Sequence, residues 1–584
     1  MSGGSDFFRI AQDSIEGAAA FWPSPHNRDV DAGDAALLAA REAEHGHAVG
    51  AAPDPRCLGR VVCVSGAQLV VCLENGENRG QADATPRKGG LVKIVGQHSV
   101  TYGIVTDLAI PLPGRGEGDA EVRLAELDLV GEATGKIGGG APAFQRGVAT
   151  HPALGDFVYA VGAEDLDLLF AVGDGQALPI GVQRQDPPCP AVLAADRLLD
   201  HHFAMLGAAG AGKSCGAAAV LRQLAKACPR VHVLILDGHN EYAAAFADKA
   251  EVIRPAEVQI PFWMLSGDEM CALLLGAAPH AARREAGALL KAAILHCRQA
   301  AAGHDQGGKA GARVSVDTPL PYGWQDLGSR IEAEARRGQS NDAALLAWLK
   351  GGLDEVRGDP SHGFLFGPAA DEDGMADILA RLLGMAGMGK PFTVLDLSTL
   401  SPEVAALIVA VVTRLVVDFG VWSNKAFPTL LVCEEAHRYA SADGASGSGL
   451  AKEALVRLAQ EGLQAGVSLC AISRHPAAIA PAVLAQCHTV FAFRMQKNED
   501  QETVHSLMAG AALGLLDFLP VLGDREAIVV GAAAPLPQRV LFDALPAAAQ
   551  PRRAPARAAQ DEKIPAADPF LIAKAIARWR QQAR

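Results

Sequence analysis

Long apolar runs with little polar alternation stand out in the second half of the chain. Six of them lie between residues 202 and 495, reading HFAMLG, HVLILD, FTVLDLS, TLLVCEE, VSLCAIS and VFAFRM. Runs of this kind predict strands buried on both faces, and the stretches between several of them are helical in character. Buried strands that alternate with helices are typical of a parallel sheet, so we expect an α/β core.

A different pattern occupies residues 57–181. Short β-rich runs such as RVVCVSGAQLVVCLENG, YGIVTDLAI and GDFVYAVG alternate there with glycine and proline turns. Closely spaced short strands predict a small antiparallel barrel or sandwich.

These patterns divide the chain into five parts. Residues 266–389 are mostly helical in pattern, and a Pro/Ala-rich linker follows the last apolar runs. The predicted parts are an N-terminal extension (1–55), a β-barrel (56–185), an α/β core (186–265 and 390–545), a helical insertion (266–389) and a linker with a C-terminal tail (546–584). From Pro551 the tail carries eight basic and three acidic residues, which is 8 − 3 = +5. Such a tail is either solvated, braces another subunit, or contacts nucleic acid or a partner.

The most membrane-like segment is VAALIVAVVTRLVVDFGVW. Arg414 and Asp418 interrupt it, and Ser401 with Pro402 before it predicts a helix N-terminus. We therefore expect a buried core helix and no membrane partner. The N-terminus lacks the pattern of a secretory signal, and eleven cysteines without a C-x-x-C pair suit a reducing compartment, so a cytoplasmic location is expected.

Charge narrows the function classes only slightly. The chain has 52 basic and 66 acidic residues, which gives a formal net charge of −14. Hydrophobic residues make up 49% of it, as in a globular protein. This balance argues against a uniformly basic surface that coats nucleic acid, but it is compatible with a basic channel inside an acidic exterior.

A phosphate-binding motif follows the run HFAMLG. The sequence GAAGAGKS matches G-x-x-x-x-G-K-S, with an apolar strand before it and an Ala/Leu-rich helix after it, as this loop requires. Its backbone N–H groups and the helix N-terminus would hold the phosphates of ATP. Lys213 would reach the β- and γ-phosphates, and the Ser214 hydroxyl would bind Mg²⁺. The predicted nucleotide-binding residues are Gly207, Ala208, Ala209, Gly210, Ala211, Gly212, Lys213, Ser214 and Cys215.

Carboxylates end two of the other apolar runs. A P-loop NTPase needs one carboxylate toward Mg²⁺ and another that positions the attacking water. Glu434 and Glu435 end the run TLLVC, so we assign Glu434 to the metal and Glu435 to the water; the alternative is a solvated acidic strand end. Asp237 ends HVLILD and either faces the same ligand crevice or serves as a structural cap.

The motifs taken together resemble the HerA family of hexameric P-loop ATPases, within the HerA–FtsK group. The resemblance covers roughly residues 57–584 and rests on ordered motifs that include FQRGVATHPALGD, LDGHNEY, PFWMLSGDE, CEEAHRYA, AQEGLQAGVSLCAISRHP and LPVLGDREAIVVG. It implies a barrel of the assembly-domain type, a RecA-like motor core with a helical insertion, and a six-subunit ring whose pore admits double-stranded DNA.

Two departures from the family pattern concern the site. The family usually has E-G-R-K-x-G where this chain has Glu461, Gly462, Leu463, Gln464, Ala465 and Gly466, so Leu463 and Gln464 stand at the Arg-Lys pair. Arg474 stands where the family has the glutamine of S-Q-R-P. The resemblance implies that Arg474 lies near the γ-phosphate, with a cation in place of a water-positioning amide.

Ring ATPases also use a cation from the neighbouring subunit. Arg457 is our choice for this intersubunit finger, with Arg474, Arg494 and Arg438 as alternatives. His437 is either a relay between DNA and nucleotide or an oriented structural histidine.

Two functions from different classes fit these residues. The first is an ATP-driven translocase of double-stranded DNA that works with a separate NurA-like nuclease or defence effector in DNA end processing or anti-phage defence. The second is a ring-shaped ATPase scaffold that assembles and regulates such an effector with little translocation. A GTPase-like switch is disfavoured because no N-K-x-D motif follows a suitable strand.

Overall fold

The computed structural model describes residues 56–551 apart from short segments at 75–85, 97–98, 111–121, 137–139, 174, 185–188, 255–256, 258, 277–279, 306–313, 338–342, 368–369, 371–372, 386–389, 444–448 and 509–512. The predicted N-terminal extension and the predicted C-terminal tail from residue 552 onward lie outside the described residues.

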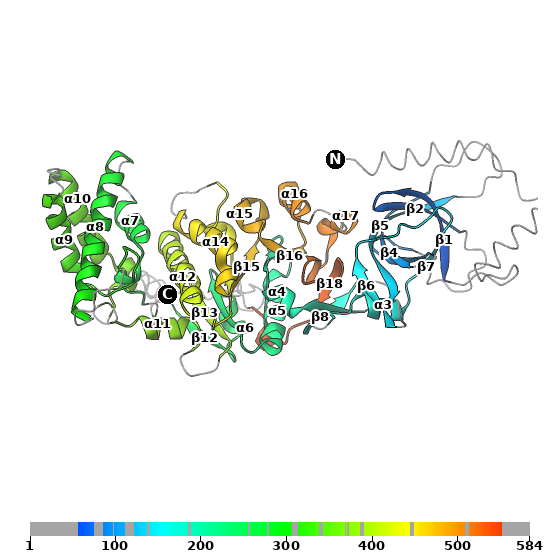
Figure 1. Ribbon diagram of the computed structural model, residues 1–584, viewed down its shortest axis with the longest axis horizontal. Helices are drawn as coiled ribbons and strands as arrows, with labels where there is room; N and C mark the ends of the chain where they lie inside the picture. The colour runs from blue at the N-terminus through cyan, green and yellow to red at the C-terminus, as the bar shows by residue number, and fades with distance from the viewer. Residues whose placement is uncertain are drawn as a thin grey trace, which may run out of the picture.

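The chain begins with an antiparallel barrel, at the right in Figure 1. Its elements are β1 (Cys57–Ser65), β2 (Gln68–Leu73), β3 (Leu91–Val95), β4 (Val100–Ala109), β5 (Arg123–Lys136), β6 (Gly140–Arg146), β7 (Phe157–Ala160) and α3 (Ala163–Leu169). The strand order is β2-β1-β7-β3-β4-β5-β6, and an additional β2–β5 pairing closes six strands into a barrel. Strand β6 pairs with the far end of the long β5. The predicted N-terminal barrel is confirmed.

An eleven-stranded sheet forms the core. Its strands are β8 (Ala177–Gln183), β9 (Pro190–Ala194), β10 (His202–Leu206), β11 (His232–Asp237), β12 (Ala250–Ile253), β13 (Phe392–Asp396), β14 (Thr429–Cys433), β15 (Val467–Ser473), β16 (Cys487–Phe493), β17 (Glu526–Gly531) and β18 (Gln538–Phe542). The order is β12-β13-β11-β14-β15-β10-β16-β17-β18-β8-β9. The pairs from β12 to β16 are parallel, and those from β16 to β9 are antiparallel.

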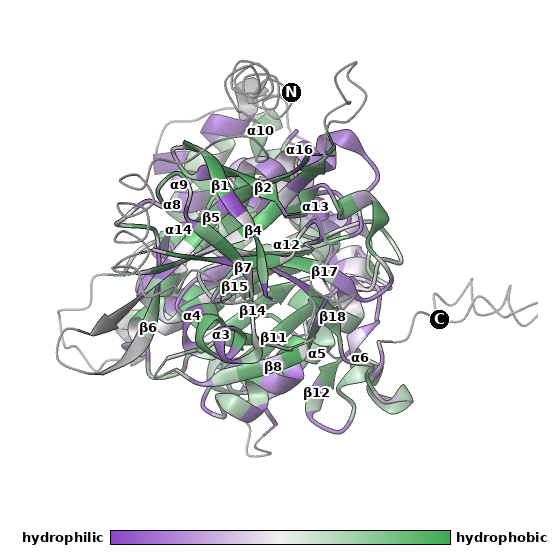
Figure 2. Cartoon of the chain, turned by 90° about the vertical axis from the view of Figure 1, so that its right-hand side faces the viewer, coloured by the Kyte–Doolittle hydropathy of each residue, from purple (hydrophilic) through white to green (hydrophobic). Residues whose placement is uncertain are grey.

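The six apolar runs form the six consecutive parallel strands from β13 to β16 in this order. Each strand is buried on both faces: in β14, Leu430 and Val432 pack into one hydrophobic cluster, and Leu431 and Cys433 pack into another. Helices therefore cover both faces of the sheet, which is coloured green through the middle of Figure 2. The predicted RecA-like α/β core is confirmed.

The hairpin of β8 and β9 belongs to this core sheet. Strand β8 pairs with β18 through Val182 and Leu541, and β9 forms the sheet edge. The barrel therefore ends before Ala177, earlier than the predicted boundary at residue 185. The antiparallel extension joins segments more than 350 residues apart in the sequence, and the local pattern of β8 gives no sign of that partner.

Nine helices of the described residues accompany the core sheet. They are α4 (Ala195–Leu199), α5 (Lys213–Ala227), α6 (Tyr242–Ala245), α12 (Pro402–Trp422), α13 (Ala436–Tyr439), α14 (Gly449–Glu461), α15 (Pro481–Leu484), α16 (Asn498–Leu507) and α17 (Leu513–Leu516). Ser401 caps α12 by accepting the Val404 N–H at 3.3 Å, and Pro402 occupies the first turn, as predicted. Helix α12 is long and apolar enough to cross a membrane, but 78% of its most apolar window is buried inside the protein. It is the buried core helix that the sequence predicts.

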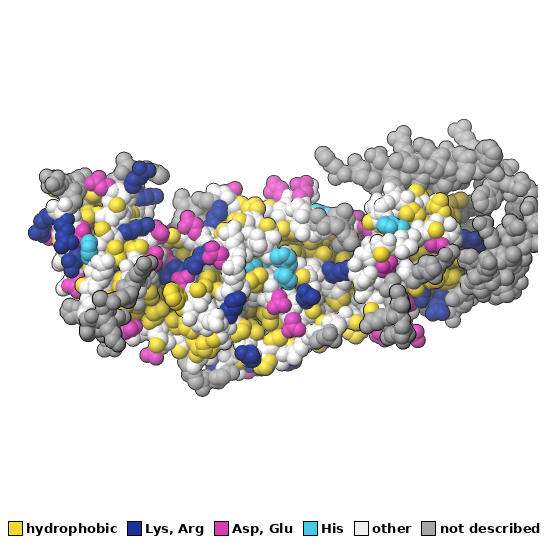
Figure 3. Space-filling view, viewed as in Figure 1, with side chains coloured by type: hydrophobic (Ala, Val, Ile, Leu, Met, Phe, Trp, Pro, Cys, Tyr) yellow, Lys and Arg dark blue, Asp and Glu magenta, His cyan; other side chains and the backbone are white. Residues whose placement is uncertain are grey.

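Helices fill most of the described part of residues 266–389, at the left in Figure 1. They are α7 (Gly267–Leu275), α8 (His280–Asp305), α9 (Trp324–Arg337), α10 (Ala343–Gly358) and α11 (Met375–Leu382). The face seen in Figure 3 carries basic and acidic side chains intermixed over the insertion and the core.

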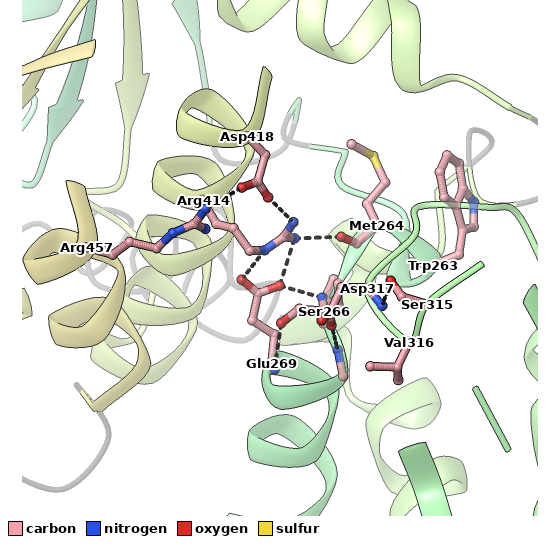
Figure 4. A network of polar contacts seen from close by, with 12 residues as sticks. Trp263, Met264, Ser266, Glu269, Ser315, Val316, Asp317, Arg414, Asp418 and Arg457 are labelled. Carbon is pink, nitrogen blue, oxygen red and sulfur yellow. Dashed lines mark hydrogen bonds and ion pairs between the residues drawn. The ribbon is translucent and has the colours of Figure 1, made fainter. Parts of the chain in front are cut away.

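An ion-pair network joins this insertion to the core (Figure 4). Arg414 of α12 donates to both carboxylate oxygens of Glu269 on α7, at 2.8 and 2.9 Å, and to the Met264 carbonyl at 2.7 Å. Asp418 links Arg414 to Arg457 of α14. Because the Arg414 and Glu269 side chains are largely buried, this contact fixes α7 against α12.

Candidate functional site

The loop between β10 and α5 has the backbone of a phosphate cradle. Gly210 and Gly212 adopt left-handed conformations, with φ of 79° and 97°. A Cβ at Gly212 would lie 2.9 Å from the Arg525 backbone nitrogen, so this position needs glycine for space as well as for conformation. Neighbouring strand ends hold the loop, because Ala208 N–H donates to the Arg494 carbonyl at 2.8 Å.

Lys213 lies at the first turn of α5, directly after this loop. Its Nζ donates to the carbonyls of Gly207 and Ala208, at 2.8 and 2.9 Å. The amine therefore curls over the loop, and it would exchange these carbonyls for phosphate oxygens when a nucleotide binds. Ala209 is exposed, whereas Ser214 and Cys215 are half-buried at the helix start. Burial and the Glu241 charge raise the pKa of the Cys215 thiol, and Arg525 opposes this.

Three carboxylates meet at the ends of two neighbouring strands. Strands β11 and β14 are paired in parallel, and Glu434 N–H donates to the Leu236 carbonyl at 3.2 Å. Asp237, at the end of β11, is fully buried, and Glu434 is 4% exposed. The strand order thus places Asp237 beside Glu434, with Glu435 following directly, as the predicted common crevice requires.

Asp237 organises the turn that leads into α6. Its Oδ1 accepts the N–H groups of His239 and Glu241, each at 3.2 Å, and its Oδ2 accepts that of Tyr242 at 2.8 Å. Burial, followed by the charge of Glu434 and a hydrogen bond with it, raises the pKa of Asp237 to about 8. The three backbone N–H groups that Asp237 accepts give it the geometry of the structural cap.

Glu435 has an unusual backbone and close basic neighbours. Its φ is 51°, in the left-handed region, which is uncommon for a residue other than glycine. Its Oε2 lies 3.2 Å from His437 Nδ1 and 3.4 Å from Arg474 Nε, and its Oε1 lies 3.8 Å from His239 Nδ1. A strained residue at a strand end with a held carboxylate is typical of a functional position.

The pKa values of the two neighbouring histidines are shifted in opposite directions. Burial, with the charges of His475 and Arg474, lowers the pKa of His437 to about 4, so its ring is neutral at pH 7. Its Nδ1 lies 3.0 Å from Ser473 Oγ, which also accepts the His475 N–H at 3.0 Å. This contact supports the oriented histidine rather than the relay. By contrast, a hydrogen bond with Glu434 raises the pKa of His239.

The acidic pair fits a hard divalent cation. Glu434 Oε2 and Glu435 Oε2 are buried and accept no hydrogen bond within the described structure. Buried carboxylate oxygens without a donor are costly, and carboxylate and hydroxyl oxygens are the ligands that Mg²⁺ prefers. Mg²⁺ at nucleotide sites usually takes only one or two protein ligands, so the absence of a larger His/Cys/Asp/Glu cluster among the described residues is compatible with it. Ser214 and Glu434 would hold the ion.

The candidate arginines lie in different places. Arg474 reaches Glu435, as described above. Arg457 lies on α14, where it pairs with Asp418 at 2.9 Å and Glu461 at 3.1 Å, so within one chain it belongs to the network of Figure 4 and not to the carboxylate group. Arg494 pairs with Asp524 at 3.0 Å.

Two residues near the site were not predicted from the sequence. Arg525 packs its backbone against Gly212 in a left-handed conformation with φ of 63°, and Ser473 orients His437. Both lie in motifs that carry the family resemblance, but neither has a charge partner or spacing in the sequence that marks it separately.

Known proteins resemble this chain at several levels. The model of the HerA helicase central domain matches residues 178–416. A probable helicase of Methanocaldococcus jannaschii is 25% identical over 408 residues, which cover 65% of this chain and 69% of the relative. A probable DNA double-strand break repair helicase HerA of the same organism is 34% identical over 116 residues, covering 20% of this chain and 22% of that protein.

Solved structures give a more distant likeness. VirB4 of Thermoanaerobacter pseudethanolicus aligns with a TM-score of 0.45 and 18% identity, over 64% of this chain and 98% of that one. The plasmid coupling protein TrwB in complex with ADP and Mg²⁺ aligns with a TM-score of 0.41 and 15% identity, over 67% and 94%. The central-domain match includes the segment that carries the phosphate loop, and this chain is similar to helicase-like P-loop ATPases of the HerA family.

Proposed function

We propose that this protein hydrolyses ATP and uses the energy to move along double-stranded DNA as a ring of six subunits. The observation that supports this most is the arrangement of one phosphate loop after β10 and two glutamates after β14 at the same edge of a parallel sheet, in which β15 lies between the two strands. Its relatives include proteins named DNA double-strand break repair helicases.

Each residue has one task in the proposed reaction. The loop N–H groups and Lys213 hold the β- and γ-phosphates. Ser214 and Glu434 would hold Mg²⁺, which would supply positive charge beside these phosphates. Glu435 orients the attacking water and takes its proton as the water oxygen bonds to the γ-phosphorus and the bridging oxygen leaves with ADP. Asp237 keeps the turn beside Glu434 in place. Arg474 from this subunit and Arg457 from its neighbour are the proposed cations.

The protein partner in this proposal is a separate chain. No nuclease-like metal cluster occurs among the described residues, so cutting of DNA would reside in a NurA-like nuclease or a defence effector. DNA end processing and anti-phage defence both fit this division of work.

A second function is favoured by one specific feature. Leu463 and Gln464 replace the Arg-Lys pair of the family, and Arg474 replaces its glutamine. If these changes slow turnover, the ring acts mainly as a scaffold that assembles and regulates an effector.

The decisive experiment measures ATP hydrolysis with and without duplex DNA, on full-length protein whose mass in solution is known. The motor predicts a hexamer whose turnover rises strongly with duplex DNA and is lost in Lys213→Ala, which should not bind ATP. Indifference to DNA with tight retention of a co-expressed effector supports the scaffold. A monomer without turnover would contradict both.

A further inference from the structure

Arg474 and Glu435 project from the same edge of the sheet. Glu435 follows β14 and Arg474 follows β15, and these strands are paired in parallel with Cys433 opposite Ala471. Arg474 Nε lies 3.4 Å from Glu435 Oε2, and the Glu435 side chain is 12% exposed. A guanidinium thus stands directly against the carboxylate that the proposed reaction uses.

The surroundings of Glu435 make this charge important. The adjacent Glu434 is also a buried carboxylate, and two acidic groups side by side repel each other in a poorly solvated place. His437, although it is only 3.2 Å from Oε2, is neutral at pH 7 because its pKa is lowered to about 4. His437 therefore cannot supply the compensating charge, whereas an arginine is always protonated.

The backbone of Glu435 gives a second reason for a partner. The residue is left-handed with φ of 51° and precedes α13 without making a side-chain cap hydrogen bond. Within its own turn the carboxylate contacts only His437 among the described ion pairs, and the other contacts come from groups on different elements, His239 and Arg474. Arg474 is one such group: its side chain is 39% exposed, and the strand end that carries it is anchored because the Ser473 carbonyl accepts the Gly207 N–H at 3.2 Å.

We infer that Arg474 is a positioning residue that holds and charge-balances the Glu435 carboxylate for water activation, and that it acts through Glu435 and not by contact with the γ-phosphate. This inference rests on the proposed ATPase function. It accounts for a cation where the HerA family pattern has glutamine, since an amide cannot balance a second buried carboxylate.

The first test separates binding from turnover. In full-length protein, Arg474→Gln and Arg474→Ala should lower kcat by about 10- to 100-fold, as loss of an orienting neighbour does, and leave KM for ATP within about twofold. Arg474→Lys should recover much of the loss because it keeps the charge. Arg336→Gln, which removes an exposed arginine paired with Glu332 on α9 of the insertion, is the matched control and should keep wild-type kcat.

The second test asks whether Arg474 acts through Glu435. In a double-mutant cycle, Arg474→Ala should lower the residual kcat of Glu435→Gln by less than about twofold, since residues that act as a unit are not additive. Equal losses of kcat in wild-type and Glu435→Gln protein would overturn the inference in favour of direct phosphate contact. A raised KM for ATP together with a lowered kcat would do the same. A wild-type kcat in Arg474→Gln would also overturn it.

Failure of the proposed ATPase function would give a different result from failure of the Arg474 inference. Wild-type protein without any ATP turnover would refute the ATPase itself, whereas wild-type turnover with additive effects would refute only the role of Arg474. Equal melting temperatures of Arg474→Lys and Arg474→Gln, combined with different kcat values, would show that folding is not the cause.

Discussion

At the scale of single residues, Glu435 combines the position, backbone conformation and burial that water activation needs. It is held at a strand end beside Glu434, its backbone is left-handed, and its Oε2 is buried without a hydrogen-bond donor among the described residues. Its neighbours are a neutral histidine, His437, a permanent cation, Arg474, and the more distant His239. The charge of this one side chain should therefore control turnover without controlling nucleotide binding.

Glu435→Gln tests this directly. We expect ATP turnover to fall by about 10²- to 10⁴-fold, the usual contribution of a positioned base, because the amide cannot take a proton. ATP affinity should persist, since the loop and Lys213 remain. Turnover and equilibrium binding of ATP are the two measurements. Glu453→Gln, on an exposed position of α14, is the control, and wild-type hydrolysis in Glu435→Gln would remove Glu435 from its proposed role.

At the scale of elements, a buried histidine joins two central strands. His202 begins β10, is 1% exposed, and accepts the Leu469 N–H of β15 on its Nδ1 at 2.9 Å. Burial lowers its pKa to about 4, from 6.5 in an unfolded chain. The folded protein therefore binds fewer protons than the unfolded chain between these values, and stability from this residue is lost as the pH falls from 6.5 toward 4.

His202→Leu should reveal that linkage. At pH 7.5 the variant should be less stable by about 1–3 kcal/mol, because the Leu469 N–H loses its acceptor. At pH 5 the gap should narrow by on the order of 1–2 kcal/mol, since only the wild type still carries the penalty of a neutral buried histidine. Melting temperatures at both pH values measure this. The exposed His151→Leu should show the same small effect at both, and a gap that widens at pH 5 would contradict the prediction.

The contact between the insertion and the core is a second element-scale feature. Arg414 has a 14% exposed side chain and makes two hydrogen bonds to Glu269, a residue that also closes the capping box of α7 with Ser266. Removing one partner of a buried pair leaves the other charge uncompensated, which costs about 3–5 kcal/mol.

Arg414→Leu should therefore lower the free energy of unfolding by about 3 kcal/mol and expose the insertion to limited proteolysis. Arg336→Leu is the matched control, because its pair with Glu332 is exposed and screened by solvent and should contribute little to stability. Thermal melting and the pattern of proteolytic fragments are the readouts. Equal losses in the two variants would mean that the network does not hold the insertion.

Much of the fold can be predicted from the sequence, because a buried parallel strand appears as a continuous apolar run. The runs that form β10, β11 and β13–β16 are apolar throughout, and their carboxyl ends carry Asp237, Glu434 and Arg474. The order of the strands in the sheet cannot be predicted from such local patterns. The 3.4 Å approach of Arg474 to Glu435 depends on β15 lying beside β14, and the β8–β18 pairing depends on contacts between distant segments.

At the scale of the whole molecule, the barrel, the core and the insertion lie in a row (Figure 1). Residues from one chain surround the carboxylates, but Arg457 is turned to the α12–α14 network with a side chain that is 42% exposed. Within one chain it therefore makes no contact with Glu435 among the described interactions. If Arg457 has a catalytic part, it must act on the site of a neighbouring subunit.

Mixing subunits tests this arrangement. Arg457→Ala alone should lose most turnover, as removal of an arginine finger does, and Glu435→Gln alone should lose it through the water site. In a mixture of the two variants, some sites pair an intact Glu435 with an intact Arg457 from the next subunit, so turnover should exceed the sum of the separate rates. Glu453→Gln mixed with Glu435→Gln serves as the control for simple dilution. Full activity of Arg457→Ala alone would instead assign Arg457 to the network of Figure 4, where its loss should lower only the melting temperature.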